Sequence, residues 1–163
     1  MAVLEGKVWR YGDNIDTDVI IPARYLNTFD PKELAKHCMV DIDKDFAQKV
    51  RPGDIMVGGK NFGCGSSREQ APEIIKALGI QCVIAKSFAR IFFRNSINNG
   101  LLLIEQPTLY DDIKEGDTVS VVMNEHIDYN GKEYPIASLP ENLMDIIRAG
   151  GLVKAMRKLN GLD

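Results

Sequence analysis

Short apolar runs alternate with helical patterns through the middle of the chain. The apolar runs cover 55–57, 81–86 and 101–105, and the helical patterns cover 67–79 and 87–100. Strands joined by such crossovers pair in parallel, because each helix returns the chain to the end of the sheet where the strand began. The alternation predicts a parallel α/β core, with Gly79 and Gly100 taking positive φ angles just past the helices.

The segment before this core predicts one strand and one helix. Residues 3–10 alternate loosely between apolar and polar side chains and end in a polar loop, as a strand does. Asp30 and Pro31 then supply a cap and a first helical residue for a helix over 31–38. Between the two elements a proline interrupts a short apolar run, so this connection is expected to be irregular.

The segment after the core predicts a smaller antiparallel portion and two final helices. Strand patterns cover 117–124 and 126–136, and Asn130 with Gly131 predicts a tight hairpin turn in the second. Apolar residues at helical spacing cover 141–149 and 152–159, and we expect the last helix to pack back on the sheet. Residues 1–163 are therefore expected to form one α/β domain with a mixed sheet flanked by helices.

Composition limits the partners that this chain can have. Lys and Arg total 20 against 23 Asp and Glu, so no strong positive field attracts nucleic acid or an anionic membrane. No stretch approaches the roughly 20 apolar residues that span a bilayer, which predicts a cytoplasmic protein.

The cysteines and histidines show no metal-binding spacing. Cys38, Cys64 and Cys82 are widely separated and form no C-x-x-C pair, so neither a disulfide framework nor a metal site on this chain is expected. Cys38 and Cys82 lie in apolar or helical patterns typical of buried cysteines. His37 and His126 are too far apart for a zinc-ligand pair.

A glycine-rich loop, residues 58–69, leaves a strand and enters a helix. We expect Ser66 and Ser67 to cap that helix, whose free N–H groups favour an anion. Arg68 in the first turn would grip a carboxylate with its planar fork. The loop lacks the Gly-Lys-Ser/Thr of a phosphate-binding loop and the third glycine of a dinucleotide fingerprint. An anion cradle is one interpretation, and an ordinary serine cap with a solvated arginine is the other.

The longer string decides between these interpretations. NFGCGSSRE, followed by CVIAKSFARIFFRNSINNGLLLIE and preceded by YGDNIDTDVIIPARYL, resembles the capping domains of the aconitase superfamily, among them the small subunits of isopropylmalate isomerase and homoaconitase. The close match covers 7–104. The resemblance implies a swivelling β/β/α domain that closes over the active site of a large subunit. It also implies that the large subunit holds a 4Fe-4S cluster through its own cysteines, with no metal on this chain.

The resemblance implies a reaction and assigns roles to three residues. Family members remove water from a 2-hydroxy acid and add it back with the hydroxyl on the neighbouring carbon, so a base must take a proton next to a carboxylate. By resemblance, Ser66 is this base, Arg68 binds a substrate carboxylate, and Ser67 orients the loop or the substrate. A helix N-terminus and the guanidinium would make an alkoxide at Ser66 tolerable.

Further polar residues are expected near the same pocket. Asp18 matches the aspartate of the family's Thr-Asp motif and would position the base, although an Asx turn before Pro22 explains it about as well. Arg24 could reach the pocket, but a surface position is the alternative, because most arginines are exposed. Arg90 and Arg94 lie one helical turn apart and could face a partner or the cleft.

Two departures from the family pattern bear on function. Gln70 stands where the family usually has histidine, which leaves any supporting role of that side chain in doubt. The specificity loop of the family corresponds to Tyr25, Leu26, Asn27 and Thr28. Homoaconitases carry an arginine in place of Asn27 to bind an extra carboxylate, so an uncharged residue favours an apolar substrate branch near Leu26.

The leading hypothesis is therefore a hydro-lyase small subunit of the isopropylmalate isomerase type, serving leucine biosynthesis. It would act on a small dicarboxylate only when assembled with its large subunit, as a heterodimer or a higher hetero-oligomer. A small subunit of homoaconitase or of a dimethylmalate-type hydro-lyase is an alternative with the same chemistry. A non-catalytic anion- or RNA-binding module is an alternative of another class, and the acidic charge balance counts against RNA.

Overall fold

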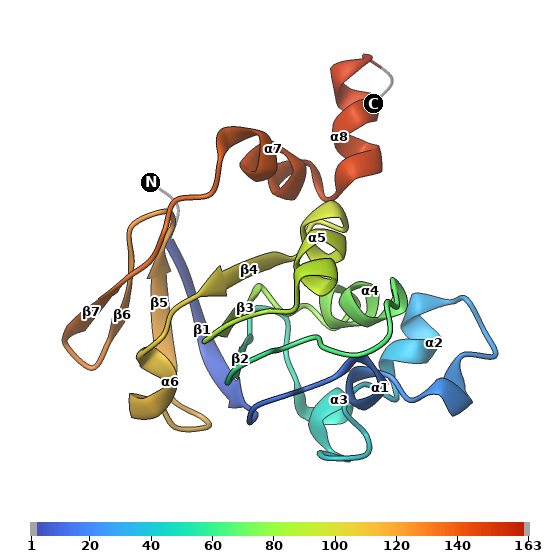
Figure 1. The fold of residues 1–163 in the computed structure, drawn as a ribbon, viewed down its shortest axis with the longest axis horizontal. Coiled ribbons are helices and arrows are strands. Elements are labelled where there is room, and N and C mark those ends of the chain that lie inside the picture. Colours follow the sequence, from blue (N-terminus) through green and yellow to red (C-terminus); the bar gives the residue numbers. More distant parts are fainter. Residues whose placement is uncertain (1–2, 162–163) are drawn as a thin grey trace.

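One mixed sheet organises the chain in a computed structural model that describes residues 3–161 (Figure 1). Its seven strands follow the order β4-β3-β2-β1-β5-β6-β7. They are β1 (Val3–Arg10), β2 (Ile55–Gly58), β3 (Cys82–Ala85), β4 (Leu102–Glu105), β5 (Thr118–Val122), β6 (His126–Tyr129) and β7 (Lys132–Pro135). The predicted α/β class with a mixed sheet flanked by helices is confirmed.

The first strand joins the two halves of the sheet. The last residues of β1 pair in parallel with β2, and its first residues pair antiparallel with β5. Strands β2, β3 and β4 continue the parallel half, whereas β5, β6 and β7 form the antiparallel half. The predicted hairpin turn is confirmed, because Asn130 and Gly131 have φ angles of 51° and 79°.

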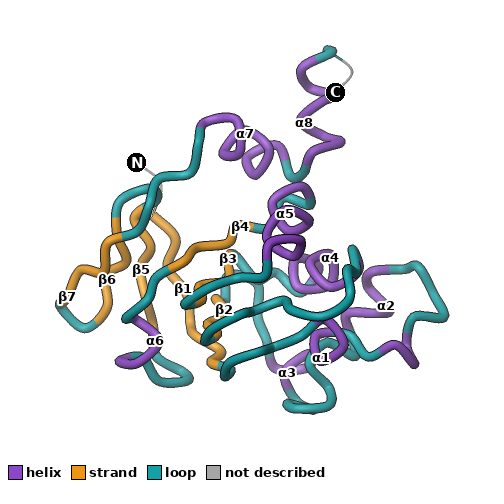
Figure 2. Tube along the Cα trace, viewed as in Figure 1, coloured by secondary structure: helices purple, strands orange, loops and turns teal. Residues whose placement is uncertain are grey.

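Helices and short helical turns occupy the connections (Figure 2). They are α1 (Thr17–Ile20), η1 (Ala23–Tyr25), α2 (Pro31–Ala35), α3 (Phe46–Lys49), α4 (Gln70–Ala77), α5 (Arg90–Asn98), α6 (Leu109–Asp112), α7 (Glu141–Ala149) and α8 (Leu152–Leu159). Asp30 caps α2 through the N–H of Lys32, as predicted. Gly79 and Gly100 follow α4 and α5 with φ angles of 89° and 83°, as predicted. None of the described helices is long and apolar enough to cross a membrane.

The parallel strands are buried on both faces, which explains why they appear as continuous apolar runs. Met56 and Val83 belong to one hydrophobic cluster together with residues of α2, α3 and α4. Their neighbours Ile55 and Cys82 belong to a second cluster, which continues into the antiparallel strands. Successive side chains of a strand point to opposite faces, so the two clusters fill the two sides of the sheet.

The expected packing of the last helix on the sheet is wrong. Figure 1 shows α8 projecting from the body, and none of its residues is buried. Val153 and Leu159 are 73% and 86% exposed. The cause is the joint before it, because Gly150 and Gly151 have φ angles of 91° and 134° and turn the chain away after α7.

A buried polar contact ties the first strand to the turn before the second, and it yields a stability prediction. Trp9 Nε1 donates to Asp54 Oδ2 at 2.9 Å, and the same oxygen accepts the backbone N–H of Arg51. Asp54→Ala leaves the indole N–H buried without an acceptor, so we expect the free energy of unfolding in urea to fall by about 1–3 kcal/mol. Glu125→Ala, at an exposed carboxylate, is the control and should change it by less than about 0.5 kcal/mol. Equal stability of the two variants would contradict this account.

Candidate functional site

Three loops at the carboxyl ends of β1, β2 and β3 lie side by side (Figure 2). Isolated bridges extend the parallel pairing into them, joining Asp16 to Cys64 and Phe62 to Phe88. The N–H of Gly63 donates to the carbonyl of Ile15 at 2.6 Å, and the N–H of Ala89 donates to the carbonyl of Phe62 at 3.0 Å. Ligands of open α/β sheets commonly bind at this end of the strands, so the loops are the place to look for a site.

Glycine is required where the central loop packs on α5. Gly63 has a φ of 86°, and a Cβ there would lie 2.1 Å from Cγ of Phe92, which no side chain could accept. Gly65 also has a positive φ, of 91°, and reverses the chain directly before Ser66. The two glycines therefore present the serines at the surface while their backbone stays close to the core.

A cleft of roughly 300 Å³ opens where the loops meet α5. The polar side chains that line it are those of Thr17, Ser66, Ser67, Arg68, Arg90 and Asn95. Ser66 and Ser67 are exposed, whereas the side chain of Arg68 is only 18% exposed. The structure thus brings together the three residues of the glycine-rich loop that were expected to carry the chemistry.

The predicted capping of the helix by these serines is wrong. Helix α4 begins at Gln70, and Glu69 precedes it without a side-chain capping bond. The Oγ1 of Thr17 donates to the carbonyl of Ser66 at 2.6 Å, which holds the loop out of helical conformation. Arg68 is consequently not in the first turn, and the helix dipole, whose effect falls off within one turn, acts weakly at Ser66. Positive charge near Ser66 therefore comes from side chains.

The two serines differ in their contacts. Ser67 Oγ accepts a hydrogen bond from Nδ2 of Asn95 at 3.3 Å. The hydroxyl of Ser66 has no hydrogen-bond partner within residues 3–161, although its backbone is fixed by Thr17. Neither Asn95 nor Thr17 is a predicted site residue, because their contacts with the glycine-rich loop join residues that are distant in the chain. Ser66 is thus a positioned hydroxyl that is free to contact a ligand.

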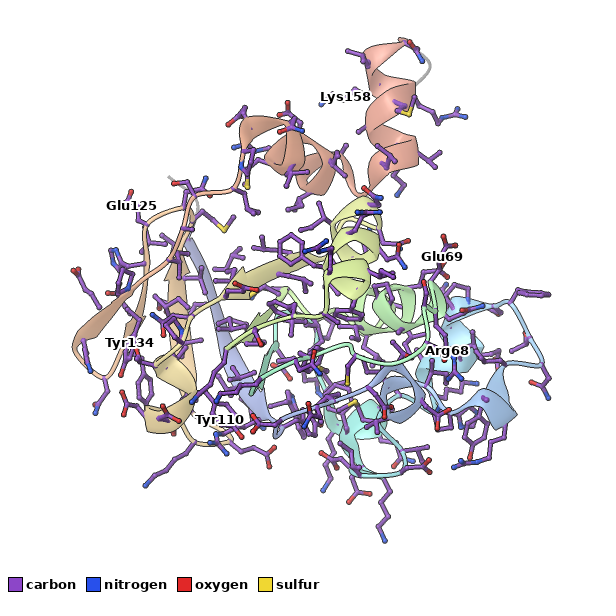
Figure 3. All side chains as sticks on the ribbon, viewed as in Figure 1. Arg68, Glu69, Tyr110, Glu125, Tyr134 and Lys158 are labelled. Atoms are coloured by element: carbon purple, nitrogen blue, oxygen red, sulfur yellow. The ribbon has the colours of Figure 1, made fainter. Side chains whose placement is uncertain are left out.

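Arg68 is held by one edge of its guanidinium. Its Nη1 donates to Oδ1 of Asp18 at 3.0 Å and to the carbonyl of Ile21 at 2.9 Å. Figure 3 shows neighbouring Glu69 pointing away from the body. In the described part of the chain, Nε and Nη2 of Arg68 have no hydrogen-bond partner. Three of its five N–H groups are therefore available for a carboxylate in the cleft.

Asp18 contacts the backbone of Ala23 and the guanidinium of Arg68, and its predicted role in positioning Ser66 stays a prediction. Its Oδ1 accepts the backbone N–H of Ala23 at 3.0 Å, which closes the turn around Pro22, and it also accepts from Arg68. The hydrogen bond from Arg68, and then the one from Ala23, hold the pKa of Asp18 below its ordinary value. Asp18 is therefore a carboxylate at neutral pH, and the geometry makes it a residue that orients Arg68 rather than a proton acceptor.

Arg24 and the specificity loop lie outside the cleft. Arg24 forms a two-nitrogen ion pair with Asp41 and lies over the ring of Tyr25, 4.7 Å from its centroid. Tyr25 itself stacks on His37 with ring centroids 3.8 Å apart. Leu26 packs against the core, Asn27 is exposed, and Thr28 Oγ1 accepts the N–H of Asp30. A substrate role for Arg24 and these loop residues stays a prediction.

Arg90 adds a positive charge to the cleft, which is one of the two positions predicted for it. It begins α5, is exposed, and lines the cleft opposite the glycine-rich loop. No hydrogen bond or ion pair to Arg90 is present among residues 3–161. Arg94, one turn later, is also exposed but is not part of the cleft wall. The cleft therefore contains two guanidinium groups with unused donors.

The three cysteines do not fit a shared iron–sulfur cluster. Cys38 and Cys82 are fully buried in the two clusters on opposite faces of the sheet, and burial raises the pKa of the Cys82 thiol to about 12. Cys64 lies in the glycine-rich loop, and partial burial raises its pKa as well. Within the described residues the cysteines form no group of potential metal ligands.

The fold and site together define a class. An α/β domain that presents a free hydroxyl beside two guanidinium groups, at the carboxyl ends of its parallel strands, is built to bind a small carboxylate. Among the described residues, no carboxylate or histidine lines this open cleft.

Comparison with known proteins gives the family. The model of the aconitase C-terminal domain matches residues 7–109. A protein of Lachnospira eligens named 3-isopropylmalate dehydratase small subunit is 65% identical, with 97% of this chain and 96% of that protein covered. A protein of the same name from Thermodesulfovibrio yellowstonii is 58% identical, with 95% and 94% covered.

A solved structure agrees with these relatives. The crystal structure of 3-isopropylmalate dehydratase from Methanocaldococcus jannaschii superimposes with a TM-score of 0.92 at 48% identity, covering 98% of this chain and 96% of that one. The chain belongs to the aconitase C-terminal domain family, among the 3-isopropylmalate dehydratase small subunits.

The contact between Asp18 and Arg68 yields a prediction about pH. Because the pKa of Asp18 is depressed in the folded state, the ion pair is intact above the ordinary carboxyl pKa and is lost as pH falls through the depressed value. We expect Arg68→Ala to raise the pKa of Asp18 toward about 3.9, measured by NMR titration of its carboxyl carbon.

Arg24→Ala is the matched control for this titration. It should raise the pKa of Asp41, whose largest lowering cause is the bond from Arg24, and leave Asp18 nearly unchanged. A pKa of Asp18 that does not respond to Arg68→Ala would show that the pair does not hold Arg68 in place.

Proposed function

We propose that this chain is the small subunit of a 3-isopropylmalate dehydratase. With a large subunit it would interconvert 2-isopropylmalate and 3-isopropylmalate by dehydration and rehydration, a step of leucine biosynthesis in the cytoplasm. The observation that carries the proposal is the exposed and unpartnered hydroxyl of Ser66 beside Arg68 in one cleft. The names of relatives up to 65% identical support it.

The first chemical step uses residues of this chain. A substrate carboxylate binds the free N–H groups of Arg68, which places the adjacent carbon over the glycine-rich loop. The oxygen of Ser66 takes the proton from that carbon, and the C–H electron pair forms the double bond as hydroxide leaves the neighbouring carbon. Rehydration reverses these events with hydroxide added at the other carbon, and Ser66 returns its proton.

Serine is a poor base, so its surroundings must favour the alkoxide. Arg68 and Arg90 line the same cleft and place positive charge around it, and their effect grows when a partner excludes water. Asp18 supports this by holding Arg68 from behind through Nη1 while the remaining donors face the cleft. In this proposal Ser67 orients the loop through Asn95.

In this proposal the departing hydroxide meets an electrophile that the partner supplies. The described cysteines do not fit an iron–sulfur cluster, so we propose that a 4Fe-4S cluster belongs to the large subunit. The chain would then act as one body over 1–163 that caps the large subunit. The open cleft supports an arrangement in which the two subunits share the site.

The uncharged Asn27 supports isopropylmalate over substrates with a third carboxylate. Asn27 is exposed, and the loop from Tyr25 to Thr28 contains no positively charged residue. The nearest one in the sequence is Arg24, directly before the loop. Arg24 is already paired with Asp41. A homocitrate-like carboxylate would therefore remain unpaired here, whereas an apolar branch would not.

Replacement of Ser66 tests the assignment of the base. In the complex with a large subunit, Ser66→Ala should lower kcat for hydration of isopropylmaleate by a factor of about 100 to 10,000, because a positioned base contributes this much. Stopped assays with product quantified by chromatography would measure it. Assembly should be unaffected, since the contact from Thr17 uses the backbone carbonyl of Ser66.

Ser120→Ala on β5, outside the cleft, is the control and should retain normal turnover. A complex of Ser66→Ala that assembles and turns over within a few fold of wild type would remove Ser66 from the proton transfer.

The assignment of the cluster gives an independent prediction. Purified anaerobically without a large subunit, the chain should contain no stoichiometric iron by elemental analysis, because Cys38 and Cys82 are buried on opposite faces of the sheet. A 4Fe-4S spectrum from the isolated chain would show that the cluster binds to this chain, and the proposal that the large subunit holds it would be wrong.

A further inference from the structure

Strand β4 ends the sheet yet is buried. It pairs only with β3, but Leu102, Leu103 and Ile104 are 3%, 1% and 7% exposed. An edge strand normally presents its free backbone groups to water or is covered by another element. Beside β4 there is instead a cavity of roughly 370 Å³.

The cavity runs along the free edge of this strand. All four residues of β4 line it, although alternate side chains of a strand point to opposite faces. Four consecutive residues can contact one space only along the strand edge. The other residues that line the cavity are mostly apolar and include Phe88, Phe93, Met123, Ile136 and Leu139.

The backbone of β4 has unused hydrogen-bonding groups at this edge. The N–H of Gln106 donates to the carbonyl of Ala85 at 2.9 Å, so Gln106 and Ile104 face β3. Leu103 and Glu105 alternate with them and point their N–H and C=O groups toward the cavity. Those groups have no partner among residues 3–161. Leu103 is only 1% exposed, and buried backbone groups in proteins are nearly always paired, so we expect an external partner at its N–H and C=O groups.

We propose that an extended segment of the large subunit adds to the free edge of β4 as a further strand. This rests on the proposed function. A strand supplies carbonyl and N–H groups at the spacing of Leu103 and Glu105, and its alternate side chains would fill the apolar cavity. A small ligand or scattered water could fill the space but would not match two residues of backbone in register.

Arg90 identifies the large subunit as the source of this segment. Arg90 lines both the cleft that contains Ser66 and the cavity beside β4, so the two spaces are adjacent. A protein that closes the cleft over Ser66 therefore covers the mouth of the cavity as well. Arg90 is exposed and has no hydrogen bond or ion pair within the described chain, so it is free to contact that partner.

Amide hydrogen exchange tests the added strand directly. The probe is the large subunit that serves the 65% identical relative from Lachnospira eligens. On complex formation we expect exchange at Leu103 and Glu105 to slow by about tenfold or more, because their N–H groups gain acceptors. The amide of Ile104, already bonded to β3, should change little. Unchanged exchange at Leu103 and Glu105 in a formed complex overturns the proposal.

Proline at position 105 tests the same contact by affinity. Glu105→Pro removes an outward N–H and leaves the bonds to β3 intact, and Glu105→Ala is the matched control that keeps the N–H. We expect the dissociation constant for the large subunit to rise by about tenfold in the proline variant and to stay near wild type in the alanine variant. Equal affinity of the two variants overturns the proposal, and the exchange experiment remains decisive if the proline variant is unstable.

The outcomes separate this inference from the proposed function. If wild type assembles and hydrates isopropylmaleate while the β4 edge stays unprotected, only the added strand is wrong. If wild type neither assembles nor acts with this large subunit, the proposed function itself fails. Protection of Leu103 in the isolated chain that grows with concentration would show a second copy at the edge and would also overturn the proposal.

Discussion

The hydrogen bonds between the loops after β1 and β2 determine the rest of the site. The bridge between Asp16 and Cys64 and the bond from Thr17 to the carbonyl of Ser66 fix the glycine-rich loop to its neighbour. The pair between Asp18 and Arg68 then joins the same two segments through side chains. Because these contacts use the backbone of Ser66, they position its hydroxyl without occupying it. The hydroxyl of Ser66 is thereby positioned through its own backbone and left free for a ligand.

The same arrangement explains how an exposed ion pair can matter. Exposed pairs contribute little to stability, and Asp18 is largely exposed. The effect of this pair is geometric, because it engages one nitrogen of Arg68, a residue of the cleft wall, and leaves the other two nitrogens unbonded within residues 3–161. Arg24 illustrates the contrast, since both of its terminal nitrogens are bound by Asp41. Both guanidinium groups keep unused N–H groups, but Arg68 lines the cleft whereas Arg24 lies outside it.

Local signals in the sequence were sufficient wherever neighbours in the chain decide the structure. The apolar runs gave β2, β3 and β4, and the hairpin and the helix ends followed from Asn130, Gly79 and Gly100. They failed where distant residues decide. Thr17, 49 residues away, overrides the capping tendency of the serines, and nothing near Arg24 marks Asp41 as its partner. The direction of α8 depended on how two glycines turn, which composition does not specify.

Several groups that have no partner among residues 3–161 lie close together. The hydroxyl of Ser66, the free donors of Arg68 and the side chain of Arg90 share one cleft, and the unpaired edge of β4 adjoins it through Arg90. Leu103 is buried, so its unpaired backbone groups cost free energy in the isolated chain, whereas Ser66 and Arg90 are exposed and can bond water. Two hydrophobic clusters stabilise the sheet without these groups. The unpaired groups are therefore available to hydrogen-bond a ligand or a partner. In the proposals above, the same partner would cover the β4 edge and complete the site around Ser66, because Arg90 borders both spaces.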